Sequence, residues 1–93
     1  MEGEDEMKIK ILGAGCAKCQ QVEQIARQVV KELAIDAMVE EITDMKKIMQ
    51  YPIMTTPGLV VNGELVCSGR IPTKSEVTQF IINAMDKEEQ ARS

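Results

Sequence analysis

Two cysteines three positions apart, Cys16 and Cys19, are the residues of this chain best suited to do chemistry. They lie where a pattern typical of a strand gives way to one typical of a helix, which predicts Cys16 at the first turn of that helix. Unpaired backbone N–H groups and the helix dipole stabilise an anion there, and a thiolate is such an anion. Lys18 adds a positive charge, and no acidic residue lies between residues 13 and 21. We therefore predict that Cys16 has a pKa below that of a free thiol.

A pair with this spacing favours reversible thiol–disulfide exchange. Cys19 is predicted one helical turn after Cys16, on the same face and within bonding distance, so that one thiol attacks and the other resolves. The competing interpretation is a metal site. Zinc needs four ligands, and with three cysteines and no histidine the chain would need carboxylates or a second chain. A soft ion such as Cu(I), which two or three thiolates can hold, is the stronger alternative.

Composition limits the class of protein and its partners. The 93 residues fit one domain, with a formal net charge of −4, one Tyr, one Phe and no Trp. Without a basic stripe or an aromatic stacking surface, nucleic acid is not an expected partner. Residues 1–6 are unlike a signal peptide, and no apolar run approaches the roughly 18 residues of a membrane span. We expect a cytoplasmic protein, in which a close cysteine pair is more often catalytic or metal-binding than structural.

Apolar residues in the first half of the chain alternate in two places and follow helical spacing between them. The alternating segments, residues 8–12 and 35–42, predict strands, and residues 19–34 predict a helix with one apolar stripe. We expect Asp44 to cap a short helix and Pro52 to end it, because the residue before a proline leaves helical space. Three methionines on helical apolar faces are expected to fill the core. They are Met45, Met49 and Met85.

The second half of the chain carries the clearest local signals. Two β runs, residues 59–61 and 64–67, flank the dipeptide Asn62-Gly63, which type I′ hairpin turns prefer because both positions need positive φ. Residues 73–76 form a capping box that opens a last helix. The predicted order is βαβαββα, an α/β domain. Its parts are an acidic tail over residues 1–7, a folded domain over 8–86 and a charged tail over 87–93.

The hairpin register predicts the position of the third cysteine, Cys67. If the turn pairs Val61 with Glu64 and the ladder continues, Cys67 lies opposite Gly58, beside Pro57. We expect Cys67 to be a small buried hydrophobe, because free cysteine is among the most buried residue types. A third thiolate ligand or a regulatory thiol is the alternative.

Three features together resemble the thioredoxin and glutaredoxin superfamily, most closely its branch of small glutaredoxin-like thioredoxins, also called redox-active disulfide proteins. They are the cysteine pair after the first strand, Thr56-Pro57 before the hairpin and Gly69 after it, in that order within residues 8–86. The resemblance implies a thioredoxin-like fold, with a four-stranded mixed sheet flanked by helices. It also implies a cis Pro57 packed against the cysteine pair, with the Thr56 backbone exposed to pair with an extended substrate segment.

The same resemblance implies a thiol–disulfide oxidoreductase that needs no cofactor or metal. Cys16 would attack and Cys19 resolve, while Thr56 and Pro57 orient the substrate. Gly15 would let the backbone approach closely, and Lys18 would support the thiolate. The implied partners of this monomer are disulfide-containing protein substrates and an upstream electron donor of the thioredoxin-reductase type, with no nucleic acid or membrane.

Two other classes of protein compete with this interpretation. A ferredoxin-like metal carrier also places two cysteines after its first strand, but it needs a strand after its last helix. Here Met85 is followed by Asp86-Lys87-Glu88-Glu89-Gln90, which does not predict a strand. A pure interaction module of the same fold would not need both thiols. The remaining alternative is a protein of the thioredoxin-like fold that binds or carries Cu(I) through Cys16 and Cys19.

Overall fold

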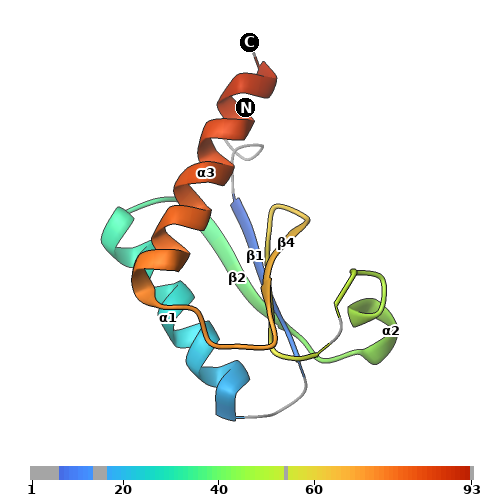
Figure 1. Ribbon diagram of the computed structural model, residues 1–93. Coiled ribbons are helices and arrows are strands. Elements are labelled where there is room, and N and C mark those ends of the chain that lie inside the picture. The colour runs from blue at the N-terminus through green and yellow to red at the C-terminus, as the bar shows by residue number, and fades with distance from the viewer. Residues whose placement is uncertain (1–6, 14–16, 54, 93) are drawn as a thin grey trace.

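The computed structural model describes residues 7–13, 17–53 and 55–92, with the backbone alone over 88–92. Its helices and strands follow the predicted order βαβαββα (Figure 1). The strands are β1 (Met7–Leu12), β2 (Ala37–Ile42), β3 (Gly58–Val61) and β4 (Glu64–Ser68). The helices are α1 (Ala17–Leu33), α2 (Met45–Ile48) and α3 (Lys74–Arg92).

The four strands form one mixed sheet in the order β2-β1-β3-β4. β1 is parallel to β2 and antiparallel to β3, and β3 is antiparallel to β4. A parallel pair needs a crossover connection, which α1 supplies between β1 and β2. Helices lie on both sides of the sheet (Figure 1). The predicted fold class, a four-stranded mixed sheet flanked by helices, is confirmed.

Two apolar clusters hold the layers together. The larger one joins β1, β3 and β4 to α1 and α3, and the apolar stripe of α1 contributes Val22, Ala26 and Val29, each at most 1% exposed. The smaller cluster lies on the opposite face of the sheet, where Ile48 of α2 packs against Leu12 and Val60. Burial of these side chains, at about 25 cal/mol per Å² of apolar surface, is the main favourable term for so small a domain.

The predicted cap of the short helix, the predicted capping box and the predicted hairpin turn are all present in the structure. The Asp44 carboxylate accepts a 3.0 Å hydrogen bond from the Lys46 N–H and so caps α2. At the start of α3, the Glu76 carboxylate accepts from the Thr73 N–H at 2.9 Å, and the Thr73 hydroxyl accepts from the Glu76 N–H at 3.1 Å. Asn62 and Gly63 have φ values of 51° and 85°, as a type I′ turn requires.

A β-bulge in the hairpin changes the predicted partner of Cys67. The two residue pairs next to the turn form as predicted, but the register then shifts by one residue, so Cys67 lies opposite Leu59 and not opposite Gly58. The shift puts the consecutive residues Val66 and Cys67 against the same apolar cluster, on the α1 and α3 side of the sheet. Leu65 packs on the other side. A bulge re-aims a side chain in this way, and here it turns the thiol of Cys67 toward the larger core.

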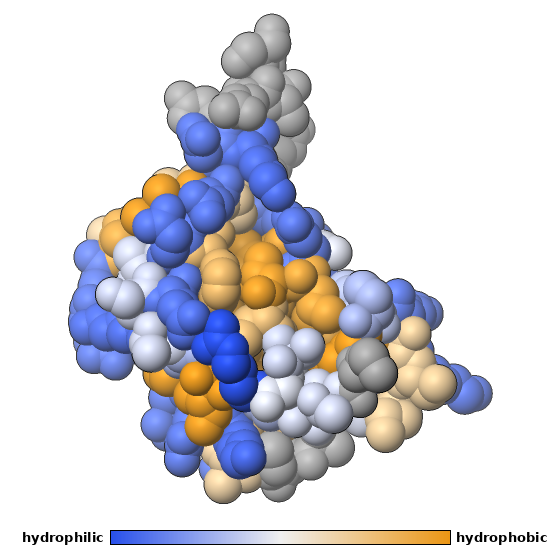
Figure 2. Space-filling model, in the orientation of Figure 1, coloured by the Kyte–Doolittle hydropathy of each residue, from blue (hydrophilic) through white to orange (hydrophobic). Residues whose placement is uncertain are grey.

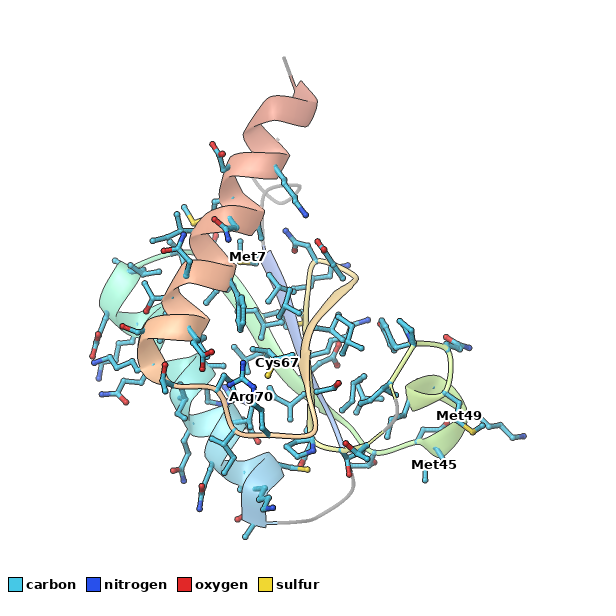
Figure 3. All side chains as sticks on the ribbon, viewed as in Figure 1. Met7, Met45, Met49, Cys67 and Arg70 are labelled. Atoms are coloured by element: carbon cyan, nitrogen blue, oxygen red, sulfur yellow. The ribbon has the colours of Figure 1, made fainter. Side chains whose placement is uncertain are left out.

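The prediction that three methionines fill the core is wrong. Met45, Met49 and Met85 are 64%, 75% and 42% exposed. Because α2 has a single turn, only Ile48 can face the sheet, and Met45 and Met49 point away from it (Figure 3). In the larger core the positions on α3 are taken by Val77 and Ile81, both 0% exposed.

α3 continues through residues 87–92, which we expected as a charged tail. This part of α3 runs past the ends of the strands (Figure 1). The Lys, Glu, Gln, Ala and Arg residues of this segment all favour a helix. The last turns therefore need little packing against the sheet to stay helical.

Candidate active site

The candidate site lies where β1 ends and α1 begins. Gly15 and Cys16 fall outside the described residues, between Gly13 and Ala17. Cys19 is the third residue of α1, and its side chain is 0% exposed within the larger core. Lys18 is exposed beside it, and the first turn of α1 holds no acidic residue. The described start of α1 thus presents a buried thiol and an exposed cation in consecutive positions.

Gly13 brings the end of β1 against both Cys19 and the segment before β3. Its N–H donates a 3.0 Å hydrogen bond to the carbonyl oxygen of Ile42, which fixes its backbone on β2. A methyl group built on its Cα would overlap the Cys19 sulfur and lie 3.5 Å from the Cβ of Thr56. Two of the residues singled out in the sequence, Cys19 and Thr56, therefore both lie close to Gly13. The sequence marks Gly13 only as the end of a strand and does not indicate this approach.

Thr56 and Pro57 form the second side of the site. Their peptide bond is cis, the isomer that the resemblance implies. Thr55 and Thr56 are exposed, whereas Pro57 is buried. Gly69, after β4, donates a 2.9 Å hydrogen bond from its N–H to the Pro57 carbonyl oxygen. Gly69 has φ at +78°, and a Cβ added to it would overlap the Thr55 hydroxyl, so this glycine packs against the segment from the side of β4.

An open, mainly apolar groove of about 550 Å³ continues from Thr56 toward α2. It is lined by Met45, Ile48, Met49, Ile53, Thr55 and Thr56. Figure 2 shows apolar side chains at the surface in the region of α2, and Figure 3 shows the two methionines on the exposed side of that helix. The exposed thioethers thus extend the candidate site with a surface that an apolar side chain of a partner can contact.

Comparison with known proteins decides the family. A family model for the thioredoxin domain matches residues 7–82. The chain is also 47% identical over 75 residues to a protein named thioredoxin from Methanothermobacter thermautotrophicus, covering 81% of this chain and 97% of that protein. The chain belongs to the thioredoxin family. A second thioredoxin-family relative, named thioredoxin, from Methanocaldococcus jannaschii, is 35% identical over 71 residues, covering 76% of this chain and 81% of the relative.

Solved thioredoxin structures share the fold at low sequence identity. Chloroplastic thioredoxin z superposes with a TM-score of 0.66 at 14% identity, covering 92% of this chain and 83% of that one. Oxidised thioredoxin from Plasmodium falciparum gives a TM-score of 0.60 at 16% identity, covering 91% and 92%. The predicted superfamily is therefore confirmed from both sequence and fold, and this chain is a thioredoxin-like redox protein.

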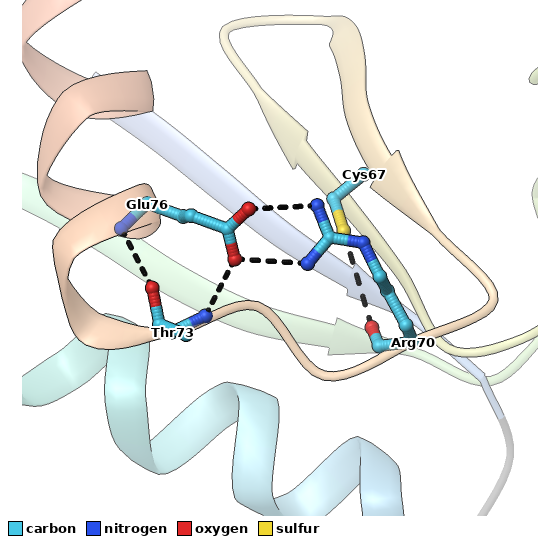
Figure 4. A network of polar contacts seen from close by, with 4 residues as sticks. All are labelled: Cys67, Arg70, Thr73 and Glu76. Atoms are coloured by element: carbon cyan, nitrogen blue, oxygen red, sulfur yellow. Dashed lines mark hydrogen bonds and ion pairs between the residues drawn. The ribbon is translucent and has the colours of Figure 1, made fainter.

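The third thiol of this thioredoxin-family chain, Cys67, lies inside the core. It is 9% exposed, and burial raises the pKa of its thiol, against a smaller opposing effect of the Arg70 guanidinium. Its S–H donates to the Arg70 carbonyl oxygen at 3.9 Å (Figure 4). The prediction of a small buried hydrophobe is confirmed, because a thiol in this setting is neither exposed nor readily ionised.

The described residues contain no set of side chains placed to bind a metal ion. Among them, no three His, Cys, Asp or Glu side chains gather closely enough to hold a metal ion. Cys16 is outside this set of residues. In the part of the chain that the structure covers, no helix is long and apolar enough to cross a membrane.

Proposed function

We propose that this thioredoxin-family chain reduces disulfide bonds in protein substrates through Cys16 and Cys19, as a thiol–disulfide oxidoreductase. The proposal rests on one observation: at the start of α1, the Cys19 sulfur lies against Gly13, and Thr56 lies close to the same glycine. A buried thiol in the first turn of a helix, beside a backbone segment open to solvent, has the position of a resolving thiol. The two relatives named thioredoxin support the same activity.

The reaction has two exchange steps. The Cys16 thiolate attacks one sulfur of the substrate disulfide, the S–S bond breaks, and the other substrate sulfur leaves as a thiolate that takes a proton from water. Cys19 then loses its proton to water and attacks the Cys16 sulfur. The bond between Cys16 and the substrate breaks, and the second substrate sulfur leaves. The substrate has gained two electrons, and the chain holds a Cys16–Cys19 disulfide.

The substrate is proposed to lie along residues 55–57. Thr56 is exposed next to Pro57, so its backbone can pair with an extended substrate segment as a short β ladder. Gly15 would let the substrate backbone approach closely, and Lys18 would stabilise the Cys16 thiolate. Side chains flanking the substrate cysteine would enter the apolar groove beside Met45 and Met49.

The remaining parts of the proposal concern partners and place. An upstream reductase of the thioredoxin-reductase type would return two electrons to the Cys16–Cys19 disulfide, with the protein acting as a monomer in the cytoplasm. A reducing compartment fits a chain whose chemistry starts from the dithiol form of the cysteine pair. No cofactor is required, because the exchange takes place between sulfur atoms alone.

Trapping of a disulfide-bonded protein substrate tests the proposal. The Cys19→Ser variant should accumulate a covalent mixed disulfide on a non-reducing gel, because attack proceeds and resolution does not. The Cys16→Ser variant should trap nothing, and Cys67→Ser should behave like the unmodified protein. Trapping by Cys16→Ser alone would reverse the two roles. If the unmodified protein reduces nothing and instead binds one Cu(I) per chain, the protein is a metal carrier and the proposal fails.

A further inference from the structure

At Gly13, the backbone at the end of β1 passes close to the sulfur of Cys19. An alanine Cβ at position 13 would overlap the Cys19 Sγ atom, although its distances to the Cys19 Cβ, 3.6 Å, and the Thr56 Cβ, 3.5 Å, are ordinary. The conflict therefore concerns the sulfur atom specifically. Only glycine, which has no side chain, lets Sγ occupy the place that it has in this structure.

The backbones on both sides of this contact are held in place. The Gly13 N–H is held by the Ile42 carbonyl oxygen at 3.0 Å, at the end of the β1–β2 ladder. On the other side, α1 is anchored by Val22 and Ala26, which are 1% and 0% exposed in the larger core. Close-packed interiors transmit rather than absorb such a displacement, so an added methyl group would shift the sulfur itself.

We propose that Gly13 is a positioning residue for the resolving thiol, and that the missing side chain at this position sets where the Cys19 sulfur lies. The proposal rests on the proposed function of Cys19. In the resolving step, the Cys19 sulfur must approach the Cys16 sulfur in line with the bond to the leaving substrate sulfur. A methyl group at position 13 would move the Cys19 sulfur off that line and leave the first attack, by Cys16, unchanged.

The first test is a double-mutant cycle that measures the stability of the reduced protein to urea. Gly13→Ala is made in the unmodified chain and in a Cys19→Ala background. Gly13→Ala should lower the urea midpoint in the unmodified chain and lower it much less when Sγ is absent. The backbone cost of placing alanine at φ +153° is common to both backgrounds and cancels. Gly63→Ala is the matched control, because Gly63 has φ +85° and no atom within 4 Å of the added methyl group. It should cost the same in both backgrounds.

The second test separates the two exchange steps with a disulfide-bonded protein substrate. Gly13→Ala should form the mixed disulfide within about twofold of the unmodified rate. It should resolve that mixed disulfide about 10- to 100-fold more slowly, the scale expected for a misplacement of about 1 Å. A merely structural defect would slow both steps or neither. Gly63→Ala should leave both rates unchanged.

Either of two outcomes would overturn the inference. One is an equal loss of stability on Gly13→Ala in both backgrounds, and the other is a resolution rate of Gly13→Ala equal to that of the unmodified protein. If Gly13→Ala alone does not fold, the double variant with Cys19→Ala decides: folding supports the inference, and failure to fold overturns it. If the unmodified protein reduces no disulfide, the proposed function fails, whereas the stability cycle still reports on the contact.

Discussion

Arg70 and Glu76 face each other through two hydrogen bonds, Nη1 to Oε1 at 2.8 Å and Nη2 to Oε2 at 2.9 Å (Figure 4). Glu76 also belongs to the capping box at the start of α3, where it accepts from the Thr73 N–H. Arg70 follows Gly69, whose N–H is bonded to the Pro57 carbonyl oxygen. The pair thus ties α3 to the loop that holds the candidate substrate segment.

The first prediction concerns the stability of this pair in acid. Hydrogen bonding to Arg70, and then to the Thr73 backbone, lowers the pKa of Glu76 from its ordinary value of 4.5 to about 2. A carboxyl whose pKa is depressed on folding stabilises the fold above its unfolded pKa, and loses that contribution as the pH falls toward its folded pKa. In urea titrations, Glu76→Gln should be less stable than the unmodified protein near neutral pH. The difference should disappear between about pH 5 and pH 2.

Glu64→Gln is the matched control for that prediction. Glu64 pairs with Lys87 through one 2.9 Å contact, with both side chains at least 60% exposed, so its removal should change little. A constant difference between Glu76→Gln and the unmodified protein across the whole pH range would show that the ionised pair does not stabilise the fold.

The second prediction concerns Cys67. Cys67→Val replaces a buried thiol by an apolar group of similar size, which should change the free energy of unfolding by less than about 1.5 kcal/mol. Cys67→Ser buries a hydroxyl and should cost about 1 to 3 kcal/mol. Both variants should reduce disulfides at the unmodified rate, measured where each is fully folded. A loss of activity in Cys67→Val would assign the thiol a chemical role.

The elements that the sequence predicts best are those whose cause is local. Asn62-Gly63 and Asp44 act through their own backbone preferences and hydrogen bonds, so the turn and the cap can be predicted from neighbouring residues alone. The bulge before Cys67 depends on which face of the sheet α1 and α3 cover, which no short pattern contains. Met45 and Met49 look like core residues because helical spacing does not reveal that α2 ends after one turn.

In the candidate site, too, some features could be predicted from the sequence and one could not. Cys19, Thr56 and Pro57 can be singled out because cysteine and a threonine–proline pair are chemically distinctive and occur in the order that the family resemblance requires. The contact between Gly13 and Cys19 could not be predicted, since it depends on how closely α1 packs against the end of β1. Glycine carries no side chain to mark its partner, so only the folded backbone reveals this approach.

The third prediction concerns Lys18. It is exposed in the first turn of α1, where a positive charge favours a nearby thiolate. Lys18→Gln should slow alkylation of Cys16 at neutral pH by about twofold to fivefold, the range of exposed charge interactions, and the effect should shrink with added salt. Lys31→Gln, in the last turn of the same helix, is the control and should change nothing. Equal rates for Lys18→Gln and Lys31→Gln would remove Lys18 from the site.

The last prediction concerns the apolar groove next to Thr56. Met45 and Met49 are 64% and 75% exposed, and a substrate that covers them would bury apolar surface at about 25 cal/mol per Å². The double variant Met45→Gln with Met49→Gln should raise KM for a protein disulfide about threefold to tenfold, which corresponds to about 0.7 to 1.4 kcal/mol of binding free energy. Since neither side chain lies in the core, kcat and the urea midpoint should not change.

Two comparisons make that last result specific. A small disulfide such as cystine can reach the thiols without covering α2, so its KM should be the same for the double variant and the unmodified protein. Met85→Gln, on α3 and 42% exposed, removes a methionine from outside the groove and should leave KM for both substrates unchanged. If KM rises equally for the protein and the small disulfide, the methionines act on the thiols and not on the substrate. If neither KM changes, the substrate follows another path away from Thr56.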